Sequence, residues 1–364
     1  MKIGVLADDL TGAGDAALAF ERAGFRTEIF LWPPSGQRSR ADVWVISTES
    51  RGLSDEEAGK RVRRAAGLFR QWRASFVYKK IDSTLRGPVR AELDAFRLAT
   101  GNPERVPVVP AFPAAGRTVE GGRLRLEGVP LHRTAFGRDP RHPLRTDRVA
   151  DIVGDGFWIP DVKDEKVLRR VAAEAIKGKV RSAVGSAGFA AALARVLAGN
   201  RHPGESRGPG SKAGSKKPFQ TLDAGLRRHD GIKRPPVLLV SGSAHPKSRA
   251  QLGAIHSLEN VFVVSVPAQR GDPREVLRSL IRKAVREARR YGIRRFAVTG
   301  GETAAALAGA LNVRRWRVTA EVDRGVPLTV SSGVRDQSWW VTKPGGFGRE
   351  GVWKRAIHLL AKTR

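Results

Sequence analysis

Short apolar runs that alternate with longer amphipathic segments constrain the fold of this chain more than any other feature of its sequence. In the first half, such runs predict strands at Ile3–Ala7, Val43–Ser47, Phe76–Lys79 and Val106–Val109. The segments between them carry apolar residues at helical spacing and predict helices at Gly12–Ala23, Asp55–Trp72 and Val89–Leu98. Alternating strands and helices are typical of an α/β domain with a mostly parallel sheet.

The last third of the chain repeats this alternation. Apolar runs predict strands at Val237–Val240, Val261–Val266 and Phe296–Thr299. Amphipathic segments predict helices at Lys247–His256, Arg274–Tyr291 and Glu302–Leu311. A chain of 364 residues accommodates two domains of ordinary size. We therefore predict two Rossmann-like α/β domains with mostly parallel sheets, residues 1–199 and 236–364, and an active site in the cleft between them.

Residues 200–235 separate the two predicted domains. This stretch is rich in Gly, Pro, Ser, Lys and Arg and shows little periodicity, so it is interpreted as a linker or an in-frame insertion. The amino-acid sequence of residues 201–231 resembles a translated bacterial intergenic palindromic repeat. The hypothesis is a surface insertion without a catalytic role, and an ordinary ordered linker is the alternative.

Charge and cysteine content limit the classes of function. The 66 basic and 36 acidic side chains give a formal net charge of +30, spread along the chain with some bias to the C-terminal part. No nucleic-acid-binding module accompanies this charge, so specific nucleic-acid binding is not expected and stays an alternative supported by charge alone. The absence of cysteine excludes disulfide scaffolds, Cys-ligated zinc and thiol catalysis.

Hydropathy argues against a membrane protein. No apolar run approaches the roughly 18–20 residues of a membrane span. The N-terminal apolar run leads straight into Asp8 and Asp9, unlike a signal peptide. We therefore expect a cytoplasmic protein without membrane partners.

The first motif with chemical potential follows the first strand. Gly12, Gly14 and Ala17 match the G-x-G-x-x-A spacing of dinucleotide-binding loops, which leaves a dinucleotide oxidoreductase as an alternative. Three carboxylates surround the glycines and would repel a pyrophosphate: Asp8, Asp9 and Asp15. Acidic side chains at a strand end better suit hydroxyl groups or a metal ion. The plain structural alternative is Asp9 as a helix cap, with glycines for packing.

A second motif, residues 79–87, follows the third predicted strand and precedes a helix. It brings together two lysines, an aspartate, two hydroxyls and an arginine. Arg86 is suited to gripping a carboxylate, and Asp82 to accepting hydrogen bonds from sugar hydroxyls. A solvated loop with a Ser/Thr cap is the alternative.

Three glycine-containing segments follow strands in the C-terminal part: Ser241–Ser243, Thr299–Thr303 and Lys343–Gly348. The second also opens a helix, whose N-terminal amides favour phosphate oxygens. None matches the Walker sequence. One such loop alone is more often a tight turn, but the three together predict a nucleotide-triphosphate site.

Taken as a set, these motifs resemble the four-carbon acid sugar kinase family. The resemblance spans nearly the whole chain and rests on Ala7–Asp15, Lys79–Gly87, Pro110–Thr118, Thr134–Pro140, Gly185–Gly188, Ser241–Ser243, Gly300–Thr303 and Lys343–Gly348. It implies an N-terminal substrate domain, a C-terminal ATP domain and ATP-dependent phosphorylation of the terminal hydroxyl of a tetronate or 3-oxo-tetronate. The chain departs from the family pattern at Gly14 and Pro88, where the family usually has Asn, and is shorter between Val149 and Trp158. Pro88 is expected at the first helical position.

The resemblance also implies site residues. The acid sugar would be met by Asp9, Arg51, Asp82, Ser83, Thr84 and Arg86. ATP would be met by Ser243, Gly300, Gly301, Glu302, Thr303, Lys343 and Gly346.

The mechanism needs a proton acceptor and charge neutralisation. Candidate general bases are Asp15 and Asp82, and Lys80 or Lys343 would offset phosphate charge. ATP and Mg²⁺ are the expected cofactors, with no metal ligand assigned. The expected partners are ATP and a small acid sugar, and the candidate assembly is a homodimer.

Overall fold

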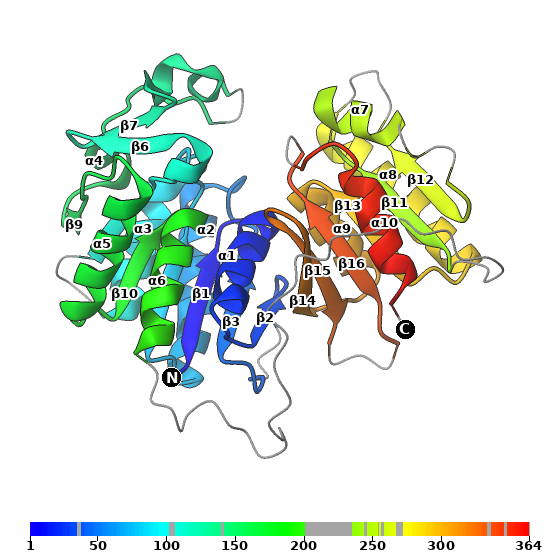
Figure 1. The fold of residues 1–364 in the computed structure, drawn as a ribbon, viewed down its shortest axis with the longest axis horizontal. Helices are drawn as coiled ribbons and strands as arrows, with labels where there is room; N and C mark the ends of the chain where they lie inside the picture. Colours follow the sequence, from blue (N-terminus) through cyan, green and yellow to red (C-terminus); the bar gives the residue numbers. More distant parts are fainter. Residues whose placement is uncertain are drawn as a thin grey trace. The chain divides into compact units, whose positions relative to one another are not determined.

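The computed structural model describes residues 1–34, 38–101, 106–139, 142–200, 235–243, 246–253, 255, 258–266, 272–332, 336–345 and 348–363. The chain divides into two compact units, Met1–Ser215 and Lys216–Arg364, and each alternates strands and helices as the sequence predicts (Figure 1). The division falls inside the predicted linker 200–235. Residues 201–234, and with them the proposed insertion, lie outside the described residues.

The first unit is built on a parallel sheet. Its strands lie in the order β2-β3-β1-β4-β10-β5-β9, and every neighbouring pair is parallel. The strands are β1 (Ile3–Ala7), β2 (Thr27–Phe30), β3 (Val43–Ser47), β4 (Phe76–Lys80), β5 (Val106–Val109), β9 (Phe157–Trp158) and β10 (Ser182–Gly185). All five residues of β1 and of β3 are buried, as expected for a sheet covered on both faces.

Helices cover this sheet in two layers (Figure 1). On one face α1 (Leu10–Arg22), α6 (Ala187–Gly199) and α5 (Glu165–Lys177) pack side by side, and α2 (Asp55–Gln71) packs with α3 (Val89–Thr100) on the other. The glycine at position 4 of β1 lets α2 pack close to the sheet, because a Cβ there would lie 2.5 Å from the ring of Phe69 on α2. The core of the unit therefore lies on both faces of the sheet.

A small antiparallel sheet, β6-β7-β8, belongs to the same unit. It comprises β6 (Arg117–Glu120), β7 (Arg123–Leu126) and β8 (Val129–Pro130). Short helical turns flank it: η1 (Pro113–Ala115), η2 (Leu131–Arg133), η3 (Ala135–Arg138) and α4 (Val149–Val153). The loop motif at 110–118 and the described residues 134–139 of the second loop motif therefore belong to this sheet and its turns.

The second unit carries a mixed sheet in the order β12-β11-β13-β16-β15-β14. Its strands are β11 (Val237–Ser241), β12 (Val261–Ser265), β13 (Arg295–Thr299), β14 (Arg315–Asp323), β15 (Val326–Ser331) and β16 (Trp339–Lys343). The first four in spatial order are parallel, whereas β14 and β15 form an antiparallel hairpin. Gly325, with φ of 73°, supplies the left-handed conformation in the two-residue turn.

Helices also cover both faces of this second sheet (Figure 1). One face packs α8 (Pro273–Arg290) beside α9 (Gly301–Ala310), and the other carries α10 (Val352–Ala361) and α7 (Pro246–Gly253). A buried cluster around Val341, Trp353 and Leu360 joins α10 to the strands.

Local chemistry explains where the elements differ from prediction. Helix α1 begins at Leu10 rather than Gly12, because the Asp9 carboxylate caps it and accepts from the Gly12 amide at 2.7 Å. Pro88 is the N-cap of α3 rather than its first helical residue. Helix α7 is described over Pro246–Gly253, and residues 254 and 256 of the predicted helix Lys247–His256 lie outside the described residues. The β14–β15 hairpin was not predicted. Among the described helices, none has the length and apolar character that crossing a membrane requires.

Candidate functional site

Polar segments meet at one edge of the first sheet. The last residue of β1, Ala7, is in register with Ser47 of β3 and Lys80 of β4. The segments that follow these strands, residues 8–9, 48–51 and 81–86, therefore leave the sheet side by side. The carboxyl edge of a parallel sheet is where α/β proteins bind ligands.

Arg51 ties the two aspartates after β1 together. Its Nε lies 2.7 Å from Asp8 Oδ2, and its Nη1 lies 2.7 Å from Asp9 Oδ2. Burial opposes the charge of Asp8, but Arg51, Lys79 and Lys80 hold the pKa of Asp8 below its ordinary value. The buried Asp8 Oδ1 has no hydrogen-bond partner among the described residues. An ionised oxygen is thus available at this edge to a hydroxyl or ammonium donor.

The segment after β4 folds around Asp82. Thr84 Oγ1 and Arg86 Nε both donate to Asp82 Oδ2 at 2.5 Å, and Ser83 lies half-buried in the same turn. Burial opposes the charge of Asp82, but the positive charges of Arg51 and Arg86 outweigh it and hold the pKa of Asp82 well below its usual range. The structure therefore brings the predicted acid-sugar residues into one ionised cluster.

The other two predicted catalytic residues of this unit lie on neighbouring elements. Lys80 Nζ donates to the Ile81 carbonyl at 2.8 Å, and a Cβ on Gly12 would lie 3.1 Å from that nitrogen. Lys80 therefore stands beside the N-terminus of α1. Asp15 lies further along α1 and is half-buried, and none of the contacts above involves it.

A buried ion pair between β4 and α3 lies next to the loop that carries Arg51, and the sequence motifs did not reveal it. Lys79 Nζ lies 2.9 Å from Glu92 Oε2, and the two side chains are 0% and 2% exposed. Ser50 donates to the other oxygen of Glu92 and shares a 2.6 Å hydrogen bond with Thr48. Glu92 on α3 thus anchors the loop that presents Arg51. Only the packing of α3 against β4 could have identified Glu92.

Glu49 was also missed by the sequence motifs. It has φ of 47°, an uncommon backbone conformation for a residue other than glycine, and accepts a hydrogen bond from Ser47. Burial, together with the charges of Asp9 and Asp8, raises the pKa of Glu49 to about 8. Glu49 is therefore mostly protonated at neutral pH and adds little negative charge beside Asp9.

Residues of the small sheet and its turns border the same cluster. The Phe136 ring lies 5.6 Å from the Arg86 guanidinium and 5.9 Å from that of Arg117. Asp139 Oδ2 lies 3.8 Å from Arg86 Nη1. The sequence motifs contained these residues but assigned them no role.

In the second unit, polar residues form a row along the carboxyl ends of three strands. Ser241 of β11 is in register with Thr299 of β13, which is in register with Lys343 of β16. The buried hydroxyls of Ser241 and Thr299 have no hydrogen-bond partner among the described residues. The predicted nucleotide loops thus start from one level of the sheet.

Close packing joins these loops. A Cβ on Gly242 would lie 1.8 Å from Thr303 Oγ1, and one on Gly345 would lie 2.6 Å from Ser243 Oγ. Ser248 Oγ bridges the loops, 3.1 Å from Ser243 Oγ and 2.5 Å from the Gly345 carbonyl. The glycines allow approaches that no side chain would permit.

Helix α9 begins directly in one of these loops. Gly300 is its N-cap, with φ of 98°, and Gly301 and Glu302 form its first turn. Glu302 is exposed, whereas Thr303 is buried. The amides at this helix start are suited to phosphate oxygens. The predicted ligand Gly346 lies outside the described residues.

Lys343 is fully buried at the end of β16. Its Nζ donates to the carbonyls of Pro344 at 3.2 Å and Gly345 at 2.9 Å. Burial, with a smaller contribution from the charge of Lys247, lowers the pKa of Lys343 to about 8. A cation is thus held among the loops at neutral pH and is lost in mild alkali.

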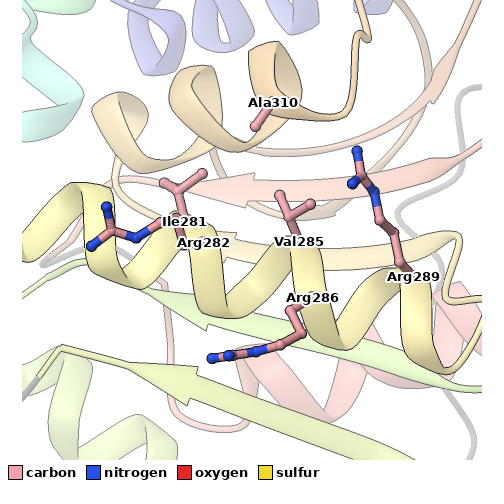
Figure 2. A pocket seen from close by; sticks show the side chains of 6 residues that line it. All are labelled: Ile281, Arg282, Val285, Arg286, Arg289 and Ala310. Atoms are coloured by element: carbon pink, nitrogen blue, oxygen red, sulfur yellow. The ribbon is translucent and has the colours of Figure 1, made fainter.

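A hollow of about 440 Å³ lies between α8 and α9 (Figure 2). In Figure 2, Ile281, Val285 and Arg289 point from α8 toward the end of α9, where Ala310 lies, and Arg286 points away. None of the predicted nucleotide-binding residues lines this hollow. It is therefore separate from the loops at the strand ends.

Two family models match the chain. One, described as a sugar-binding N-terminal domain, matches residues 3–157. The other, described as a nucleotide-binding C-terminal domain, matches residues 268–352. The first contains the cluster around Arg51 and Asp82, and the second contains the loops around Gly300 and Lys343.

Curated relatives match the chain over part or nearly all of its length. A D-threonate kinase of Bordetella bronchiseptica is 31% identical and aligns over 100% of this chain and 98% of the relative. A D-erythronate kinase of Heliobacterium modesticaldum is 40% identical over 41% of this chain and 35% of the relative. A 3-oxo-tetronate kinase of Methylobacterium radiotolerans is 27% identical over 99% of this chain and 100% of the relative.

Solved structures share the fold. A Haemophilus influenzae protein superposes with a TM-score of 0.72 at 20% identity, covering 98% of this chain and 100% of that one. A Bordetella bronchiseptica protein, 28% identical with full coverage of both chains and a TM-score of 0.52, is described as a domain-swapped dimer with bound citrate.

Proposed function

The chain belongs to the four-carbon acid sugar kinase family, and from this premise we propose that it transfers the γ-phosphoryl group of ATP to the terminal hydroxyl of a tetronate or 3-oxo-tetronate. The full-length relationship to the Bordetella D-threonate kinase carries this proposal. The hydroxyl oxygen bonds to the γ-phosphorus, the bond to ADP breaks, and the hydroxyl proton passes to a carboxylate.

The ionised cluster of the first unit supports binding of the acid sugar. Asp82 is oriented by Thr84 and Arg86 and stays ionised, as an acceptor of sugar hydroxyls must. Asp9 has its oxygens engaged by the start of α1 and by Arg51, so its proposed contribution is to shape the site together with Arg51. Ser83 supplies a further hydroxyl in the same turn.

The packed loops of the second unit support ATP binding. Gly242, Gly300 and Gly345 are positions where added side-chain atoms would meet neighbouring loops or strain the backbone. The amides of Gly242 and Gly300 donate to the carbonyls of Thr299 and Lys343, so the first-turn amides of α9 are the donors proposed for the phosphates. Ser243 and Thr303 add hydroxyls, and Lys343 adds a cation. Phosphoryl transfer depends mainly on such positioning and charge neutralisation.

Mg²⁺ is proposed to reach the site on the ATP phosphates, which commonly hold it with several waters and few carboxylates. Within the described residues, no group of three or more acidic or histidine side chains is arranged to hold a metal ion.

The general base is proposed to be Asp82 or Asp15. Asp82 lies in the cluster, whereas Asp15 lies on α1, the helix whose N-terminus is capped by Asp9 of the cluster. Lys80, beside the start of α1, and Lys343 are proposed to offset phosphate charge. Transfer requires the γ-phosphoryl group of ATP to meet the terminal hydroxyl of the bound acid sugar.

A homodimer is proposed from the Bordetella structure, which is 28% identical and described as a domain-swapped dimer. Sedimentation of the full chain measures this directly. A cytoplasmic location is proposed from the cytoplasmic substrate ATP.

A substrate screen tests the proposed activity. We expect ATP-dependent phosphorylation of at least one among D- and L-threonate, D- and L-erythronate and their 3-oxo forms, with kcat/KM of about 10⁴ M⁻¹ s⁻¹ or more. ADP release and mass spectrometry of the product measure it, and the neutral polyols threitol and erythritol serve as controls. If none of these acids supports ATP consumption, the proposal is overturned.

Alkaline pH should weaken the use of ATP. Lys343 is charged below a pKa of about 8 and neutral above it, so kcat/KM for ATP is expected to fall as pH rises through 8. The variant Lys343→Met should have a lower kcat/KM and should lack this alkaline limb. A wild-type profile that stays flat from pH 7 to 9.5, or a limb that persists in the variant, would contradict the assignment.

A further inference from the structure

Arg117 carries an unsatisfied donor at the border of the acid-sugar cluster. It is the first residue of β6, and its Nη1 donates to the Ala115 carbonyl at 2.8 Å. Its Nε is buried and has no hydrogen-bond partner among the described residues. Buried donors are rarely left unpaired in native proteins, so this N–H points to a ligand that completes it.

The surroundings of Arg117 indicate that this ligand is an anion. Phe136 lies within 6 Å of the guanidiniums of both Arg117 and Arg86, so two like charges share one ring. Burial, and then the charge of Arg86, act to lower the pKa of Arg117, against the opposing effects of Asp82 and Glu127. The guanidinium nevertheless stays charged, because an arginine is not deprotonated in proteins.

The two arginines differ in what they have left to donate. Arg86 Nε is already bonded to Asp82 Oδ2 at 2.5 Å, and its Nη1 lies near Asp139. Arg117 Nε has no such acceptor among the described residues. A carboxylate matches the planar fork of a guanidinium, with two parallel N–H···O bonds.

We propose that Arg117 binds the carboxylate of the four-carbon acid sugar through its Nε and thereby makes the site select acids over neutral sugars. This inference rests on the proposed function and adds a specificity-determining residue to it. The hydroxyl end of the substrate is left for the cluster around Asp82. Through Arg117, the motif at residues 110–118, which had no assigned role, would contribute to binding the substrate carboxylate.

A merely structural role for Arg117 makes a different prediction. If its contacts with Ala115 and Phe136 only hold the turn before β6, removing the side chain would impair tetronate, its neutral amide and ATP alike. A carboxylate ligand, in contrast, affects only the acid. Comparing acid with amide therefore separates the two roles.

The experiment uses the full chain and three variants: Arg117→Ala, Arg117→Lys and Arg125→Ala. Arg125 lies on the neighbouring strand β7 and donates to the Gly128 carbonyl at 3.1 Å, which makes it the matched control. KM for tetronate, the tetronamide and ATP is measured, and calorimetry gives the tetronate Kd without ATP. Thermal unfolding verifies that each variant folds.

Arg117→Ala is expected to raise KM and Kd for the tetronate by roughly 10- to 100-fold, as the loss of a charge-assisted contact implies. KM for ATP and for the tetronamide should change less than about twofold. Arg117→Lys should fall between, because it keeps the charge but not the fork. Arg125→Ala should match the wild type.

Three outcomes would overturn the inference. In the first, the tetronate Kd of a folded Arg117→Ala stays within twofold of the wild-type value. In the second, the variant binds the acid and the amide more weakly by the same factor. Either result refutes the role of Arg117, while wild-type turnover of tetronate leaves the kinase proposal standing. If the wild type neither binds nor phosphorylates any tetronate, both proposals fail. Calorimetry keeps the cases distinct, because it reports binding without turnover.

Discussion

Replacing Asp82 with asparagine is expected to lower kcat for tetronate phosphorylation by about 10²–10⁴-fold, the usual consequence of losing a positioned general base. Thr84 and Arg86 both reach Asp82 Oδ2, and its other oxygen accepts no hydrogen bond within the described part of the chain. That oxygen is placed to take a hydrogen bond and a proton from the sugar. Asparagine keeps the shape but removes the charge.

The same measurement on Asp15→Asn distinguishes the two candidate bases. The true base should lose kcat, whereas a residue that only binds the sugar should mainly raise KM. Asp151→Asn, a change at a partly exposed carboxylate of α4 in the same unit, is the control and should leave both parameters unaltered. Unchanged kcat in both Asp15→Asn and Asp82→Asn would contradict the proposed proton transfer.

The second large effect is expected on stability. Glu92→Ala should lower the free energy of unfolding of the first unit by about 3–5 kcal/mol, because it leaves the buried Lys79 ammonium without its carboxylate. Ser50 also loses its acceptor, so the loop that carries Arg51 should loosen. Urea unfolding of the full chain, followed by circular dichroism and tryptophan fluorescence, measures the change.

A paired replacement shows whether charge or volume causes this loss. The double variant Lys79→Met/Glu92→Met removes both charges and should recover much of the stability, since buried ion pairs are often replaceable by apolar side chains. Glu56→Ala breaks an exposed pair with Lys60 on α2 and should leave unfolding unaltered. A loss in Glu92→Ala no larger than in Glu56→Ala would refute the supporting role of Glu92.

Much of the candidate site could be predicted from sequence because of a property of parallel sheets. Polar residues that follow Ala7, Ser47 and Lys80 leave the sheet at one edge, since β1, β3 and β4 are parallel and in register. The family resemblance assigned Asp9, Arg51 and the residues after Lys80 to one site, and the parallel strands account for that grouping without side-chain geometry. The same reasoning groups the loops after β11, β13 and β16.

Residues that act across elements were beyond such reasoning. Glu92 lies in an amphipathic helix and looks like one more surface carboxylate, yet it is buried against Lys79. The β14–β15 hairpin was missed although Gly325 marks its turn. Phe136 and Arg117 lie in segments without regular periodicity, so only the structure shows that the Phe136 ring lies near the guanidiniums of both Arg86 and Arg117.

The sequence by itself determined the α/β class, the two units and the family, because periodicity and motif order are local properties that can be read along the chain. Only the tertiary structure decided that β10 lies between β4 and β5, that Lys79 pairs with Glu92, and that the buried Nε of Arg117 has no partner within the described part of the chain. Each of these depends on the packing of segments distant in the chain. Burial then sets which charges are neutralised and which remain for a substrate.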